Sequence, residues 1–207
     1  MIAISHLSRS TRLHCLLAFL LCACGTDDVN STSDATRAYL GVDRAVDRAL
    51  NLGLDGFNAA SSANIPDQTG PGDISGTLTV SGQVDQGTSD NKEMRLKTEL
   101  TTYEDRLPGG DGPGVPTGIV YATDAAALPD LGMSLRSIPD GTITGTLAGT
   151  LHMSGDLTGD VTLALTFDGT LEPVPGMAGQ IQRVVGSTHI VGTATSAYGT
   201  YTVDLTR

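Results

Sequence analysis

The sequence predicts a mostly-β domain: an antiparallel meander of about eight strands that forms a barrel or a strongly curved sheet, with one N-terminal helix. Apolar and polar residues alternate with a period of two from residue 74 onward, as in strands with one buried face. Two long alternating segments meet at Gly155-Asp156, as the arms of a hairpin do. Short, turn-rich connections separate most of the other segments, which is typical of a meander.

One helix is predicted before the strands, over about residues 34–52. Ser31 and Asp34 have the spacing of a capping box at its start. Small and apolar residues recur at intervals of three and four and form one face: Ala38, Val42, Ala45, Ala49 and Leu52. The opposite side, expected in solvent, carries Asp43, Arg44, Asp47 and Arg48. We expect Gly53 to end the helix and residues 53–73 to form a loop.

The clearest strands lie within residues 142–171. In each arm, one set of alternate positions is apolar or glycine, and the other is mostly threonine. The arms are roughly twice as long as a typical strand, so they must twist and coil. Glycines on the apolar side (Gly145, Gly149 and Gly159) suit the bends of a barrel or a curved sheet. The other strands are expected at 74–84, 92–103, 119–123 and 133–138, and two more within 181–206.

Composition limits the function classes. The formal net charge is −11, which argues against nucleic acid and against direct adhesion to anionic lipid surfaces. Tryptophan is absent and aromatic residues make up 4%, so the core is expected to be lean and built from Leu, Val, Ile and Met. The length suits one domain.

The N-terminus carries all three cysteines, Cys15, Cys22 and Cys24. Arg9 and Arg12 precede an apolar run at 13–23 that is too short to span a membrane. The sequence Leu21-Cys22-Ala23-Cys24 resembles the lipobox, the processing and lipid-attachment motif of bacterial lipoproteins. The resemblance covers only this N-terminal segment.

The lipobox resemblance implies that Cys24 becomes the first residue of the mature chain and carries fatty acyl groups such as palmitate. Two or more acyl chains give stable membrane anchoring. Because Gly25 follows, rather than aspartate, the resemblance favours the outer membrane of a Gram-negative bacterium. The expected plan is a signal peptide (1–23), a lipidated tether (24–32), a helix and loop (33–73) and the β domain (74–207). The alternative is a secreted protein cut near Ala23, with Cys24 as a free thiol.

One short segment combines two strings found in serine β-lactamases. Residues 89–92, Ser-Asp-Asn-Lys, contain both Ser-x-x-Lys and Ser-Asp-Asn. That chemistry requires the two strings on separate elements that converge in space, whereas here they overlap. We therefore expect a turn that joins the strands at 74–84 and 92–103, and no catalytic residue.

Other polar residues are weak candidates for a site. His152 and His189 stand alone in strands and are expected at the surface, since zinc requires three or four ligands. Acidic residues near loops suggest a calcium site or, more simply, solvated loop ends: Asp85, Asp90, Glu104, Asp105 and Asp111. The threonine face of residues 142–170 is either a recognition surface for sugars or a solvated sheet face. No metal and no cofactor is expected.

The function expected from the sequence is non-catalytic: a binding role or a structural and interaction role at the outer membrane, with an apolar small molecule or an envelope protein as partner besides the membrane. An apolar concave sheet would hold a lipid-like ligand, whereas a helix packed over it would indicate a structural module. The alternative is a hydrolase of envelope polymers, which needs convergent carboxyl groups; Asp160 and Asp168 are the candidates. A membrane barrel is disfavoured, because aromatic girdles are missing.

Overall fold

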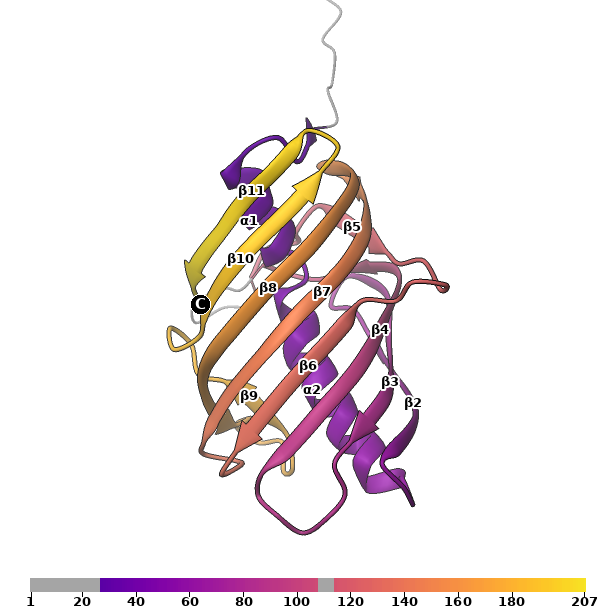
Figure 1. The fold of residues 1–207 in the computed structure, drawn as a ribbon, viewed down its shortest axis with the longest axis vertical. Helices are drawn as coiled ribbons and strands as arrows, with labels where there is room; N and C mark the ends of the chain where they lie inside the picture. The colour runs from indigo at the N-terminus through magenta and orange to yellow at the C-terminus, as the bar shows by residue number, and fades with distance from the viewer. Residues whose placement is uncertain (1–26, 108–113) are drawn as a thin grey trace, which may run out of the picture.

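The computed structural model describes residues 27–107 and 114–207. It confirms the mostly-β prediction: an antiparallel sheet curves around one helical unit (Figure 1). Cys24 and Asp111 lie outside the described residues, so the predictions for the signal peptide, the lipidation site and part of the tether stay predictions.

The described chain holds 11 strands rather than about eight. The helices are α1 (Thr32–Leu40) and α2 (Asp43–Ala59). The strands are β1 (Asp27–Asp28), β2 (Asn64–Pro71), β3 (Ser75–Val84), β4 (Lys92–Glu104), β5 (Ile119–Ala122), β6 (Asp130–Arg136), β7 (Thr142–Gly155), β8 (Leu157–Pro173), β9 (Ile181–Arg183), β10 (His189–Ser196) and β11 (Gly199–Thr206).

Neighbouring strands follow the order of a meander. The main path runs β11-β10-β8-β7-β5-β4-β3-β2, and β6 pairs with both β4 and β7. The predicted long hairpin is β7–β8, paired from Thr142↔Thr170 to Met153↔Gly159. The path ends at β11 and β2, which do not pair with each other in the described residues. The sheet is therefore curved and open.

Three strands were not predicted from the sequence. β2 lies within residues 53–73, which were expected to form a loop, so that prediction was wrong for this segment. It contains two prolines, and its register against β3 shifts between Ile65 and Gln68, so its alternation is broken. β1 and β9 have only two and three residues, too few to show a period.

The helical unit begins as predicted and bends once. Ser31 caps α1, because its hydroxyl oxygen accepts a hydrogen bond from the backbone N–H of Asp34 at 3.2 Å. The bend comes at Gly41, where a Cβ atom would collide with the ring and hydroxyl of Tyr121. That hydroxyl donates a hydrogen bond to the backbone carbonyl of Ala38 at 2.9 Å. The close approach of a buried tyrosine thus requires glycine at this position, which is also where the helical unit bends.

The helix does not end at Gly53, and that prediction was wrong. α2 continues to Ala59, with Gly53 buried on the side that faces the sheet. A Cβ atom there would lie 3.2 Å from Leu96 Cδ1 and 3.3 Å from Met94 Sδ. Gly53 therefore lets the helix backbone approach β4 closely, a packing role inside the helix.

The core lies between the helices and the sheet. It combines the predicted apolar helix face with the apolar alternate positions of the strands, including Leu78, Leu96, Ile143 and Val161. A cavity of about 30 Å³ remains among ten residues beneath α2. No described helix combines the length and the apolar character that crossing a membrane requires.

Candidate functional site

A polar cleft runs along the exposed side of α2. Its volume is about 440 Å³, and its walls come from α2, β2, β9, the connection between β8 and β9, and the end of the chain after β11. We call it the α2 cleft; its lining residues are Arg44, Asp47, Arg48, Asn51, Leu52, Asp55, Gly70, Val174, Gln180, Gln182 and Arg207.

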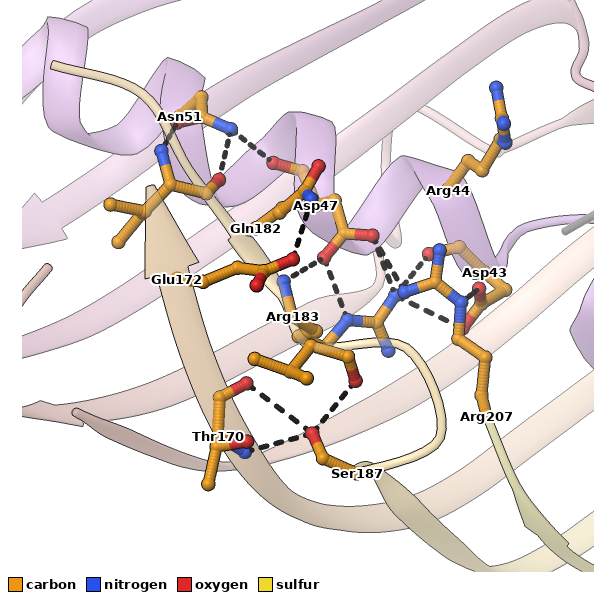
Figure 2. Close-up of polar contacts among 12 residues, drawn as sticks. Asp43, Arg44, Asp47, Asn51, Thr170, Glu172, Gln182, Arg183, Ser187 and Arg207 are labelled. Atoms are coloured by element: carbon orange, nitrogen blue, oxygen red, sulfur yellow. Dashed lines mark hydrogen bonds and ion pairs between the residues drawn. The ribbon is translucent and has the colours of Figure 1, made fainter. Parts of the chain in front are cut away.

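An ion-pair network adjoins the α2 cleft, and two of its members, Asp47 and Arg207, line the cleft (Figure 2). We call it the Arg183 network; its members are Tyr39, Asp43, Asp47, Arg183 and Arg207. The Arg183 side chain has no exposed surface, and its Nε donates to Asp47 Oδ1 at 2.7 Å. Its Nη2 donates to the backbone carbonyl of Asp43 at 2.8 Å and lies 3.0 Å from Asp43 Oδ1. Arg207 pairs with both carboxylates, so two cations face two anions.

The surroundings keep Asp47 and Arg183 charged. Burial by itself would raise the pKa of Asp47, but Arg183 and Arg207 outweigh it and hold that pKa below its usual value. Burial would lower the pKa of Arg183, but Asp47 and Asp43 raise it instead. Tyr39 donates a hydrogen bond from its hydroxyl to Asp43 Oδ1 at 2.7 Å.

A second network, which includes Arg44 and Arg48 of the same cleft, joins α2 to the connections that follow β2 and β4. Arg48 donates from Nη2 to both Asp73 and Asp105, each at 3.1 Å. Asp105 is fully buried and accepts hydrogen bonds from the Asp73 backbone N–H at 2.8 Å and from the Tyr103 hydroxyl. Arg44 pairs with Asp73 at 2.5 Å. Burial would raise the pKa of Asp73, but hydrogen bonds from Arg44 and Arg48 lower it.

These contacts correct one prediction. Asp43, Arg44, Asp47 and Arg48 were expected in solvent, yet Asp43 is fully buried and all four anchor α2 to the strands or their connections. Asn51 in the same cleft exchanges two hydrogen bonds with the backbone of Ile181, at 2.9 and 3.0 Å. The described polar groups along α2 are thus largely engaged in holding the helix in place.

The segment with the overlapping β-lactamase strings is the predicted turn between β3 and β4. Lys92 is nearly buried, and its Nζ donates to the backbone carbonyls of Gly87 at 2.8 Å and Ser89 at 2.7 Å. The same ammonium lies 4.5 Å from the centre of the Phe57 ring. Lys92 therefore ties the turn to the end of α2.

The two histidines lie apart on the outer side of the sheet. His152 pairs with Asp160 at 2.6 Å, and His189 pairs with Asp204 at 2.9 Å; both rings are substantially exposed, as expected. Asp160 and Asp168 are eight positions apart on β8, about 26 Å at 3.3 Å per residue. Paired carboxyl groups in glycosidases lie about 5–10 Å apart. No cluster of three or more metal-ligating side chains occurs in residues 27–107 and 114–207.

The acidic residues near loops do not gather. Asp85 pairs with Arg95 near the start of β4, whereas Asp105 contacts Arg48 just beyond its other end. Glu104 accepts a hydrogen bond from the Gly118 backbone N–H at 3.1 Å. The structure thus separates the described candidates for a calcium site.

The threonine face of residues 142–170 lies on the outer side of β7 and β8, and exposed threonines continue it on β10 and β11. Its hydroxyls bond to one another across strands: Thr150 to Thr162 at 2.8 Å, and Thr195 to Thr200 at 2.9 Å. Such cross-strand pairs stabilise a sheet.

Buried tyrosines predict a loss of stability at alkaline pH. Burial raises the pKa of Tyr39, Tyr103 and Tyr121 far above 10, and neighbouring carboxylates add to the shift at Tyr39 and Tyr103. A group whose folded-state pKa is raised stabilises the fold below its unfolded pKa, and this stabilisation is lost as the pH rises. We expect the free energy of unfolding to fall above about pH 10.

The check is a titration that follows tyrosinate absorbance and far-ultraviolet dichroism on the same samples. Three of the five tyrosines should ionise only when the dichroism reports unfolding. Ionisation of all five near pH 10 with unchanged dichroism would contradict this prediction.

Comparison of the chain with known proteins gives no significant match to a family model, to a curated protein or to a solved structure.

Proposed function

We propose that the protein is a non-catalytic envelope lipoprotein, anchored through Cys24, whose β domain has a structural and interaction role at the outer membrane. The observation that carries the structural role is the place of the helical unit. α1 and α2 lie on the inner side of the curved sheet, the side where a lipid-like ligand would bind (Figure 1).

The packing beneath α2 supports a structural role over a ligand-binding one. The cavity of about 30 Å³ there has room for about one water molecule. Pockets for drug-sized ligands are about ten times larger or more. The larger α2 cleft is lined mainly by polar side chains, which does not suit an apolar ligand.

The electrostatics support a non-catalytic protein. A general acid in a glycosidase needs a carboxyl group with a raised pKa. In the described residues, the carboxyl groups with clearly displaced pKa values are Asp47, Asp73 and Glu93, and all three are lowered by arginine partners. No contact in the described residues favours the hydrolase alternative.

The anchoring half of the proposal predicts that Cys24→Ala abolishes lipid attachment. Without the thiol no diacylglycerol thioether forms, so radioactive palmitate should not enter the protein, and the chain should leave the membrane fraction. Cys22→Ala is the matched control, because it removes a neighbouring thiol and should retain full incorporation. Labelled protein from the native and variant genes is compared after immunoprecipitation; equal incorporation in native protein and Cys24→Ala would refute the anchor.

The structural half is tested by native mass spectrometry of the full chain, purified from its host in mild detergent. We expect the mass of the lipidated chain without a further small molecule. A stoichiometric apolar molecule that survives a detergent exchange would overturn the structural role and favour a carrier.

A further inference from the structure

The two ends of the sheet differ in how they are protected from pairing with another chain. β2 carries Pro66, Pro71 and a register shift between Ile65 and Gln68, features that discourage edge pairing. β11 has neither proline nor lysine and pairs with β10 without a register shift, from His189↔Thr206 to Ser196↔Gly199. β11 therefore offers a long, regular edge (Figure 1).

The hydrogen-bond alternation identifies the outward groups of β11. Thr188 and Arg207 exchange two backbone hydrogen bonds, at 3.0 and 2.8 Å, just beyond the end of this hairpin. Hydrogen-bonded pairs alternate with non-bonded ones in an antiparallel ladder. Odd-numbered residues of β11 therefore bond to β10, and the even-numbered ones point their N–H and C=O groups outward: Thr200, Thr202, Asp204 and Thr206. In the described residues no hydrogen bond reaches these outward backbone groups.

We propose that β11 pairs antiparallel with β11 of a second copy, around a two-fold axis at Val203. In this register Thr202 opposes Asp204 of the second copy, and Thr200 opposes Thr206. Every outward N–H and C=O group of both strands then has a partner. An axis centred at Thr202 or at Asp204 would leave an end residue of the outward set unpaired.

The side chains are self-complementary in the same register. On the inner side, Val203 meets its symmetry mate and Tyr201 meets Leu205 of the second copy. Tyr201 and Leu205 are only partly buried at the margin of the core, so pairing covers apolar surface that the monomer leaves accessible. On the outer side no two like charges face each other.

A single paired edge buries less than a standard interface, and the net charge of −11 adds repulsion. The dimer is therefore weak and is strengthened by salt, which screens that repulsion.

Opposite charges at one position test both the dimer and its register. Thr202→Lys places an ammonium opposite Asp204 of the second copy, whereas Thr202→Asp places two carboxylates opposite each other. We expect the dissociation constants of the two variants to differ roughly tenfold, with the lysine variant tighter, because each cross-strand pair occurs twice. Thr195→Lys and Thr195→Asp are the matched controls: they make the same charge changes on β10, away from the edge, and should differ by less than threefold.

The measurement is sedimentation velocity of the full chain in density-matched detergent with excess micelles, over a range of protein and salt concentrations. Dichroism confirms that each variant folds. A chain that stays monomeric at its highest soluble concentration would overturn the proposal, and so would equal effects at positions 195 and 202. Binding of another protein to β11 without self-association would also overturn it. Repeating the series with Cys24→Ala separates this inference from the proposed anchor, on which it does not rest.

Discussion

Replacing Arg183 with methionine is expected to lower the free energy of unfolding by about 3–5 kcal/mol. The substitution removes a cation that has no exposed surface and leaves Arg207 as the remaining ion-pair partner of Asp43 and Asp47 among the described residues. A buried carboxylate stripped of its partner costs far more than the ion pair itself contributes. Urea denaturation at neutral pH, followed by dichroism, measures the change. Arg95→Met is the matched control, because Arg95 is 56% exposed and its pair with Asp85 is worth less than about 1 kcal/mol.

The pH dependence of this variant separates lost charge pairing from lost packing. The pKa of Asp47 is lowered in the folded state, so its pairing stabilises the fold above the unfolded pKa, about 3.9, and is lost as the pH falls through the folded one. The difference in free energy of unfolding between the native protein and Arg183→Met should therefore become smaller as the pH falls. Two results would contradict the role assigned to the Arg183 network. One is a loss of unfolding free energy below 1 kcal/mol at neutral pH, and the other is a difference between the two proteins that stays constant down to the pH of acid unfolding.

The sheet was predictable because its signals are local. Along β7 and β8, the large apolar side chains point inward and the threonines outward, so the alternation predicted both strands, and Gly155-Asp156 predicted their turn. The same reasoning found the capping contact at Ser31. The turn around Lys92 was predictable because its residues are too close in sequence to form two separate elements.

The contacts that hold α2 in place were not predictable from local pattern. A helical period places Asp43 and Asp47 opposite the apolar face, but their partner Arg183 is about 140 residues away in sequence. A lone arginine in the short segment 181–183 gives no sign that it is fully buried. These charge pairs anchor to the strands the face of α2 that was expected to lie in solvent. The role of Cys24 remains a prediction, since it depends on a resemblance and lies outside the described residues.

Replacing Gly53 with leucine is expected to destabilise the fold by roughly 3 kcal/mol. Even a Cβ atom at this position lies within 3.2–3.3 Å of Leu96 and Met94, so a larger side chain must push α2 away from β4. Gly53→Ala should change the free energy of unfolding by less than about 1 kcal/mol, because the better helix propensity of alanine offsets the tight contact. Asp55→Leu is the matched control: it adds a leucine two positions away, on the exposed side of α2.

Urea denaturation of the three variants distinguishes two roles for Gly53. If Gly53 provides close packing, the loss of unfolding free energy rises steeply from Gly53→Ala to Gly53→Leu, while Asp55→Leu stays within about 0.5 kcal/mol of the native protein. If Gly53 merely weakens the helix, alanine and leucine should both stabilise the fold, because both have higher helix propensity than glycine. The second result would mean that α2 is not held tightly against β4. It would also weaken the argument that the helical unit, rather than a ligand, fills the inner side of the sheet.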